Sequence, residues 1–133
     1  MTKLRKVLIV DDNPRCGELL SLAFEACGCV EVETEAKSRN ALERVQASRP
    51  DIIMLDIKMP ELDGFDVLSA IRGTGDSVPV IMCSGSALQN DVRRAYASGC
   101  NGYLEKPASL EGYRNMVSAI CQYWTMNKLP DGM

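Results

Sequence analysis

Histidine is absent from the 133 residues of the chain. Serine–histidine and cysteine–histidine catalysis, zinc bound by imidazole, and a phosphohistidine formed on this chain are therefore excluded, because each of them needs an imidazole ring. A surplus of positive charge is absent too, since 15 Lys and Arg against 18 Asp and Glu give a net charge of −3. We therefore expect no nucleic-acid partner, because the chain as a whole lacks a basic surface.

Long hydrophobic runs are also missing. The first run, residues 7–10, holds only four apolar residues before Asp11 and Asp12, whereas a signal peptide needs about 7–15 and a membrane span about 20. We therefore expect no membrane contact and a cytoplasmic location. There the six cysteines are predicted to be free thiols, because no C-x-x-C pair occurs and Cys27 and Cys29 have the wrong spacing for such a motif.

What the chain does contain is typical of one globular domain. Hydrophobic residues make up 46% and charged residues 25%, and a chain of this length can bury a core of its own. We predict a single domain over residues 1–133, with its core over about residues 5–124 and a tail over residues 125–133. Because that tail is too short for an effector domain, we expect the chain to act through contacts with other proteins.

Short apolar runs alternate along the chain with stretches of helical periodicity. The predicted strands are residues 6–10, 30–34, 51–56, 80–83 and 102–105, and the predicted helices are residues 14–26, 39–48, 65–72, 89–98 and 110–124. Five strands that alternate with five helices are typical of an α/β fold, in which helices cover both faces of a parallel sheet. Right-handed crossovers would then fix most of the topology.

Polar side chains lie at the ends of four of the five predicted strands. Asp11 and Asp12 follow the first strand, Asp56 ends the third, Ser84 follows the fourth, and Lys106 follows the fifth. Parallel strands end at the same edge of the sheet, where ligands bind in folds of this class. We therefore expect three carboxylates, a hydroxyl group and an amine to meet at that edge.

Each of these residues also has an ordinary structural explanation. An aspartate before a helix is often only an N-cap, and a strand-end serine or a surface lysine alone carries little information. Here, however, Asn13 and Pro14 suit the N-cap and the first helical position, which leaves Asp11 and Asp12 free. A carboxylate that ends a fully apolar run, as Asp56 does, is unfavourable without a partner. The convergence of the set therefore favours a functional site.

The charges at this edge indicate a missing cation. Three carboxylates and one lysine sum to −2, and two like charges about 4 Å apart repel by roughly 4 kcal/mol at an effective dielectric constant of about 20. Oxygen ligands with open positions suit Mg²⁺, which often bridges to phosphate. A carboxylate could then attack phosphorus and form an aspartyl phosphate, while the metal and Lys106 stabilise the charge on the phosphoryl oxygens.

Four segments resemble, in the same order, the receiver domain of bacterial two-component response regulators of the stand-alone, chemotaxis type. They are residues 7–12, residues 51–60 together with Gly64, residues 79–84, and residues 102–107, and the resemblance extends over about residues 5–124. It implies a flavodoxin-like, doubly wound, five-stranded parallel sheet in the order 2-1-3-4-5 with five helices. Tyr123 and Trp124, followed by residues 128–130, also resemble the receivers that are paired with bacteriophytochrome kinases.

The resemblance implies an acceptor and a metal site at the sheet edge. Asp56 would be the phosphoacceptor. Mg²⁺ would be bound by Asp12 directly, by Asp11 mainly through water, by Asp56, and by the backbone carbonyl group of Lys58.

The resemblance also implies how the phosphoryl group is bound and sensed. Ser84 and Lys106 would each contact a phosphoryl oxygen. Ser84 and Tyr103 would form a switch, in which Tyr103 turns inward when Ser84 moves toward the phosphoryl group. The peptide bond between Lys106 and Pro107 is expected to be cis, an isomer that is plausible only before proline.

The implied function is that of a phosphoacceptor signalling protein. A sensor histidine kinase or a histidine phosphotransfer protein would phosphorylate Asp56 in a Mg²⁺-dependent reaction. The change would bias the face formed by the fourth helix, the fifth strand and the last helix. A downstream protein or a second copy of the chain would bind this face or the last helix. Beyond self-phosphorylation and autodephosphorylation, no enzymatic activity is expected.

Two other functions compete with this one. Phosphatases similar to haloacid dehalogenases also use an aspartate nucleophile and Mg²⁺, but they need a second aspartate two residues later, where this chain has Lys58. A pseudo-receiver that only binds partners would not need the complete set of acidic residues, serine and lysine. Steady turnover of a phosphomonoester would favour the phosphatase, whereas a single labile phosphoryl group per chain would favour the receiver.

Overall fold

The structure, a computed structural model, describes residues 4–29 and 31–127. Within these residues, five strands form one sheet in the order β2-β1-β3-β4-β5, and every neighbouring pair is parallel. The strands are β1 (Lys6–Val10), β2 (Glu31–Glu35), β3 (Ile52–Leu55), β4 (Val80–Ser84) and β5 (Gly102–Glu105). The predicted fold class and strand order are therefore confirmed.

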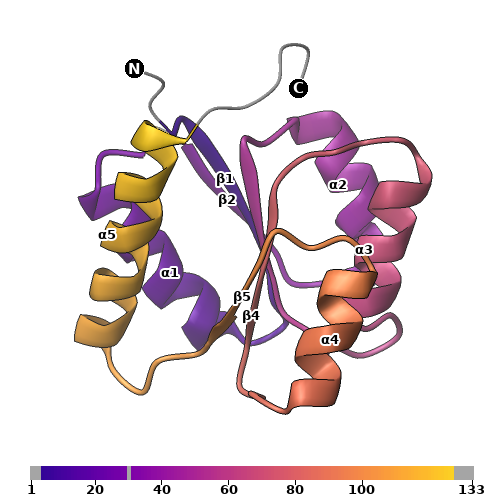
Figure 1. Cartoon of the computed structure of the whole chain (residues 1–133). Helices are drawn as coiled ribbons and strands as arrows, with labels where there is room; N and C mark the ends of the chain where they lie inside the picture. Colours follow the sequence, from indigo (N-terminus) through magenta and orange to yellow (C-terminus); the bar gives the residue numbers. More distant parts are fainter. Residues whose placement is uncertain (1–3, 30, 128–133) are drawn as a thin grey trace.

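Helices connect the strands and cover both faces of the sheet. They are α1 (Pro14–Ala26), α2 (Ala41–Ser48), α3 (Gly64–Gly73), α4 (Gln89–Ala97) and α5 (Leu110–Met126). Figure 1 shows α1 and α5 side by side on one face and α2, α3 and α4 on the other, which is the predicted doubly wound, flavodoxin-like arrangement. Within the described residues, none of these helices is long and apolar enough to cross a membrane.

The residue pattern explains the place of each strand and the start of α1. All four residues of β3 are buried, as a continuous apolar run predicts for a strand covered on both faces. The glutamate-rich strand β2 lies at an edge, where charged side chains discourage pairing with other chains. The Asn13 side chain accepts the first free N–H groups of α1 and Pro14 occupies the first turn, so the predicted N-cap is confirmed.

Some predicted boundaries differ from the structure. The helix predicted over residues 39–48 begins only at Ala41, because Ser38–Asn40 first form a 3₁₀ turn, η1; such turns are frequent at helix starts. The strand predicted over residues 30–34 lies one residue later, and Val30 is outside the described residues. The last helix continues past Trp124 to Met126. The remaining ends agree to within one residue, and the third strand is one residue shorter at each end.

The hydrophobic core has two parts, one on each face of the sheet. Successive side chains of a strand enter opposite parts, because side chains alternate with a period of two residues. One part joins Leu8, Ile53 and Met82 to Phe65 and Leu68 of α3. The other joins Ile9 and Met54 to Phe24 of α1 and to Val117 and Trp124 of α5. The carboxyl ends of the strands are therefore held by packing on both faces.

Candidate functional site

The three predicted carboxylates meet at the carboxyl ends of β1 and β3. Oxygen atoms of Asp11, Asp12 and Asp56 all lie within 4.8 Å of one another. Asp11 and Asp56 are buried, whereas Asp12 is exposed and makes no hydrogen bond or ion pair with the described residues. The strand order causes this convergence, since β1 and β3 are neighbours that end at the same edge.

Lys106 supplies the positive charge at this cluster. Its Nζ atom lies 3.0 Å from Asp11 Oδ2 and 3.4 Å from Asp56 Oδ2. Its backbone N–H donates to the carbonyl oxygen of Ser84 at 2.7 Å, which holds the start of the β5–α5 loop against β4. Burial by itself would lower the pKa of Lys106, but the hydrogen bond to Asp11 and the charges of both carboxylates raise it above its ordinary value. Lys106 is therefore a permanent cation of the site.

Asp56 is held in an environment that disfavours its charge. Burial raises the pKa of Asp56 to about 6, and the negative charge of Asp11 adds to the increase, while Lys106 and a hydrogen bond oppose it. That bond is from the backbone N–H of Ile57 to Asp56 Oδ1, at 2.8 Å. Without a further cation, the folded chain therefore binds the Asp56 proton more tightly than an exposed aspartate would.

Gly64 allows the chain to return close to Asp56. A Cβ atom at this position would overlap the carbonyl oxygen of Asp56 and would lie 2.8 Å from the Cα atom of Ile57. The N–H of Gly64 donates to the carbonyl oxygen of Ile57 at 2.7 Å and closes the β3–α3 loop at its base. Gly64 belongs to the motif quoted above, but the sequence alone did not indicate this steric role.

Ser84, Ser86 and Tyr103 form a hydrogen-bonded group beside the carboxylates. Buried Ser84 accepts the N–H of Ser86 on its Oγ atom at 3.2 Å, and the hydroxyl group of Tyr103 donates to the carbonyl oxygen of Ser86 at 2.7 Å. Ser86 Oγ in turn donates to Asp91 Oδ2 of α4 at 2.8 Å. The structure thus brings the two predicted switch residues together and adds Asp91, which no sequence motif indicated.

The site opens to a pocket that fits the expected cation. An open pocket of about 580 Å³ is lined by Asp56, Lys58, Ser84 and Lys106, together with residues 85–88. Asp56 joins this pocket to the cluster with Asp11 and Asp12, in which the donor atoms of the three carboxylates are all oxygen and Lys106 pairs with two of them. Hard oxygen donors of this kind suit Mg²⁺ better than the transition metals that prefer sulfur or imidazole.

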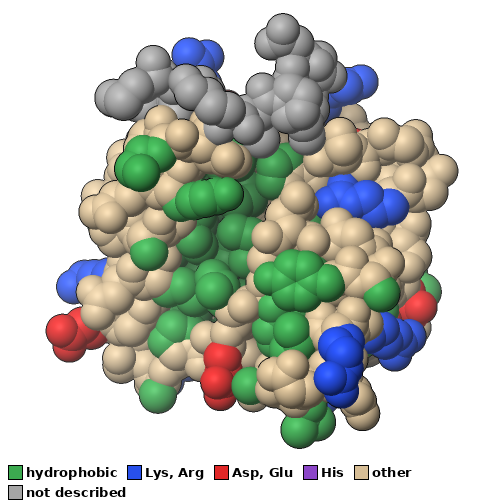
Figure 2. Space-filling model, in the orientation of Figure 1, with side chains coloured by type: hydrophobic (Ala, Val, Ile, Leu, Met, Phe, Trp, Pro, Cys, Tyr) green, Lys and Arg blue, Asp and Glu red, His purple; other side chains and the backbone are tan. Residues whose placement is uncertain are grey.

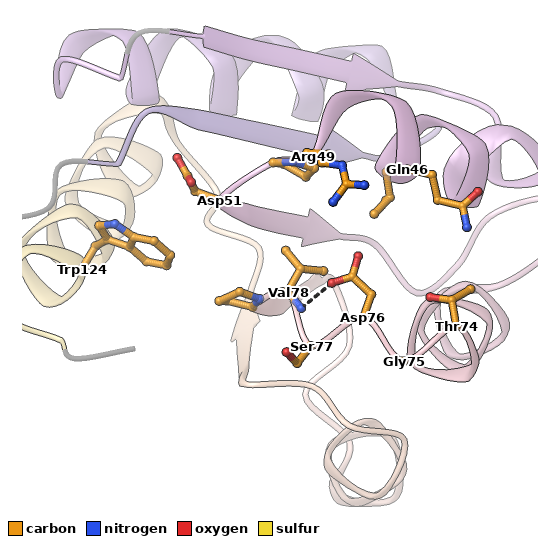
Figure 3. A pocket seen from close by; sticks show the side chains of 12 residues that line it. Gln46, Arg49, Asp51, Thr74, Gly75, Asp76, Ser77, Val78 and Trp124 are labelled. Carbon is orange, nitrogen blue, oxygen red and sulfur yellow. Dashed lines mark hydrogen bonds between the residues drawn. The ribbon is translucent and has the colours of Figure 1, made fainter. Parts of the chain in front are cut away.

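A second pocket lies at the opposite end of the molecule. Figure 3 shows this cavity of about 520 Å³, which Arg49, Asp51, Asp76 and Trp124 help to line. The carboxylate of Asp76 accepts the backbone N–H of Val78 there, at 3.0 Å. None of the predicted site residues lines this pocket, so the cavity at the carboxyl ends is the candidate site.

The predicted cis bond between Lys106 and Pro107 is wrong for this structure, because no cis peptide bond occurs among the described residues. The trans isomer is the favoured one even before proline, by about 0.5–1 kcal/mol. With the trans bond, Lys106 Nζ already reaches both Asp11 and Asp56. The geometry of the cluster therefore does not need the cis isomer.

Comparison with known sequences identifies a family. The sequence profile described as the response regulator receiver domain matches residues 7–118. A probable methanogenesis regulatory protein, FilR2, of Methanothrix harundinacea is 33% identical over an alignment of 127 residues, which covers 89% of this chain and 82% of that protein. Two further curated relatives are longer, and the chain spans 30% and 52% of their lengths.

Solved structures agree with this match. The phosphorylated cyanobacterial phytochrome response regulator RcpA is 29% identical, with a TM-score of 0.83 over 96% of this chain and 99% of that one. The Mn²⁺-bound form of response regulator Rcp1 is 25% identical, with a TM-score of 0.82 over 95% of this chain and 99% of that one.

Proposed function

The chain belongs to the response regulator receiver domain family, and from this we propose that it accepts a phosphoryl group on Asp56 and signals in a two-component system. The observation that carries the proposal is the pocket in which Asp56, Ser84 and Lys106 face one another. A nucleophile, a hydroxyl donor and a cation there surround the space that a phosphoryl group would occupy.

The proposed reaction transfers the phosphoryl group from a phosphohistidine of another protein. A carboxylate oxygen of Asp56 attacks phosphorus, the P–N bond breaks, and the imidazole nitrogen leaves with the electron pair and takes up a proton. Lys106 is placed to pair with one phosphoryl oxygen, and Ser84 is placed to donate to another once its hydroxyl group turns toward the pocket. The donor is a sensor histidine kinase or a histidine phosphotransfer protein, since this chain has no histidine.

Asp11, Asp12, Asp56 and the backbone carbonyl group of Lys58 would hold Mg²⁺ in this reaction. The ion would neutralise the acidic cluster and the incoming phosphoryl oxygens. Support comes from the spacing of the three carboxylates and from the similarity to Rcp1, of which a Mn²⁺-bound form is known. Lys106 meanwhile keeps the buried carboxylates of Asp11 and Asp56 paired.

Partner proteins would recognise the phosphorylated state through the face formed by α4, β5 and α5. Tyr103 of β5 and Asp91 of α4 both contact Ser86, and Ser86 is bonded to Ser84. A movement of Ser84 toward a phosphoryl group would therefore change the contacts on this face. Figure 2 shows hydrophobic side chains gathered in a hollow between α5 and α4. A downstream protein or a second copy of the chain would bind this face or α5.

We propose that the partner kinase is of the phytochrome class and that the chain meets it in the cytoplasm. The similarity to RcpA, a phytochrome response regulator, supports this, as do Tyr123 and Trp124 near the end of α5. Residues 128–130, which belong to the same resemblance, lie outside the described residues.

Labelling with acetyl phosphate tests the acceptor. With Mg²⁺ present, one hydroxylamine-labile phosphoryl group per chain is expected, and Asp56→Asn should abolish it. Asp76→Asn, which changes an exposed aspartate at the other pocket, should be labelled like the wild type. Phosphate-affinity electrophoresis and intact mass measure both. Persistent labelling of Asp56→Asn, or steady hydrolysis of p-nitrophenyl phosphate, would contradict the proposal.

A further inference from the structure

Ser38 is a buried polar residue that does not belong to the cluster of three carboxylates. It lies in η1, between β2 and α2, and the residue is only 4% exposed. Its Oγ atom donates to the carbonyl oxygen of Pro60 at 2.6 Å and accepts the N–H of Leu62 at 3.1 Å. One hydroxyl group therefore joins the β2–α2 connection to the β3–α3 loop.

The segment that Ser38 contacts is the loop that starts at the candidate site. It follows Asp56, carries Lys58, and is closed at its base by the hydrogen bond between Gly64 and Ile57. At its tip, Glu61 has a φ of 71°, a left-handed conformation that is strained for a residue other than glycine. Pro60 and Leu62 are the two neighbours of Glu61, so Ser38 binds the loop on both sides of its strained residue.

Other polar contacts do not replace this one. Arg39 of η1 pairs with Glu61 at 3.5 Å, but both side chains are more than half exposed, and such surface pairs contribute little. The N–H of Leu62 also donates to the carbonyl oxygen of Pro60 at 2.9 Å, a bond within the loop tip that ties it to nothing else. Ser38 is thus the buried polar anchor of the tip.

We propose that Ser38 is a positioning residue for the metal and phosphoryl site. Its hydroxyl group fixes the tip of the β3–α3 loop, and the fixed loop holds Lys58 in place along the pocket that it shares with Asp56. The inference rests on the proposed function, because a backbone oxygen of Lys58 is of use there only if a cation binds. Ser38 itself touches neither the cation nor the phosphoryl group.

The first test needs no metal. Ser38→Ala should speed amide hydrogen exchange at Leu62 by about tenfold, since local opening becomes easier when the hydroxyl acceptor is lost. Exchange at Gly64 should stay unchanged, because its acceptor is the carbonyl oxygen of Ile57 at the base of the loop. Unchanged exchange at Leu62 would overturn the inference, since the hydroxyl group would then not hold the loop.

The second test measures Mg²⁺ affinity by calorimetry and the rate of labelling by acetyl phosphate. Ser38→Ala should weaken Mg²⁺ binding about fivefold, as expected when one hydrogen bond that supports a ligand is lost. Ser38→Thr keeps the hydroxyl group and should restore most of the affinity. Ser48→Ala is the matched control, because Ser48 Oγ donates to Glu33 Oε2 at 2.6 Å at the other end of α2; its Mg²⁺ affinity should match that of the wild type.

The outcomes separate this inference from the proposed function. If the wild type binds no Mg²⁺ and takes no phosphoryl group, the proposed function is wrong, and with it the positioning role. If the wild type does both and Ser38→Ala matches it while Leu62 exchanges faster, the proposed function stands. Ser38 is then a structural anchor only, and the inference is wrong.

Discussion

At the scale of single residues, Asp56 has a pKa well above that of an ordinary aspartate. Burial and the charge of Asp11 raise its pKa to about 6, although Lys106 lies 3.4 Å away. The pKa of an aspartate in the unfolded chain is about 3.9, so between about pH 4 and pH 6 the folded chain binds more protons than the unfolded chain. Stability contributed by this residue is therefore present below about pH 4 and is lost as the pH rises through about 6.

Asp56→Asn should accordingly stabilise the metal-free chain, and more so at higher pH. We expect a gain in the free energy of unfolding of about 2–3 kcal/mol at pH 7.5 and under about 1 kcal/mol at pH 4, because the raised pKa reflects a cost of the charged form only. Urea unfolding in EDTA at both pH values measures it. Asp76→Asn should change little at either pH, and an equal gain for Asp56→Asn at both would contradict the raised pKa.

At the scale of elements, the start of α4 is held by Ser86, the residue that also contacts Ser84 and Tyr103. Leu88 occupies the N-cap position and supplies no side-chain cap. Instead, Ser86 Oγ accepts the N–H of Leu88 at 3.3 Å and donates to Asp91 at 2.8 Å. The carbonyl oxygen of Ser86 also accepts a hydrogen bond from the hydroxyl group of Tyr103. The first turn of α4 and the side chain of Tyr103 are thus tied to one residue.

Asp91→Ala should therefore loosen the first turn of α4. Loss of the bond to Ser86 should make local opening easier by about 1 kcal/mol, or about fivefold in amide exchange. The N–H of Val92, which donates to Leu88, reports this turn. Asp91→Asn keeps a side-chain oxygen and should exchange much like the wild type. If Asp91→Ala and the wild type protect Val92 equally, Ser86 and Asp91 do not fix the start of α4.

The elements also show where sequence patterns suffice. The buried run of β3 and the cap and proline of α1 are local signals, and the structure confirms both. The contact between Ser38 and Pro60 could not be predicted, because it joins residues that lie 22 positions apart in the sequence. Contacts of this kind join two loops, and neither loop carries a periodic pattern that would indicate the other.

At the scale of the whole molecule, the topology creates the site. Each strand end is determined locally, but only the order β2-β1-β3-β4-β5 places Asp11, Asp56, Ser84 and Lys106 side by side. The alternation of strands and helices predicted that the strand ends share one edge, and the resemblance to receiver domains implied the strand order that brings these four residues together. Neither indicated which oxygen faces Lys106, or that Lys106 Nζ would lie closer to Asp11 than to Asp56, because those distances depend on side-chain packing.

Binding of Mg²⁺ should stabilise the whole fold, because the three carboxylates come together only in the folded chain. At a free concentration of about one hundred times Kd, linkage gives about 2.7 kcal/mol, which thermal unfolding measures as a rise in Tm. Asp12→Asn should lose most of this rise and keep its metal-free Tm, since Asp12 is exposed and makes no hydrogen bond or ion pair with the described residues. Asp76→Asn should keep the full rise, and potassium chloride of equal ionic strength should give none. An undiminished rise for Asp12→Asn would mean that the ion binds elsewhere, and the metal site proposed at the carboxyl ends of β1 and β3 would have to be abandoned.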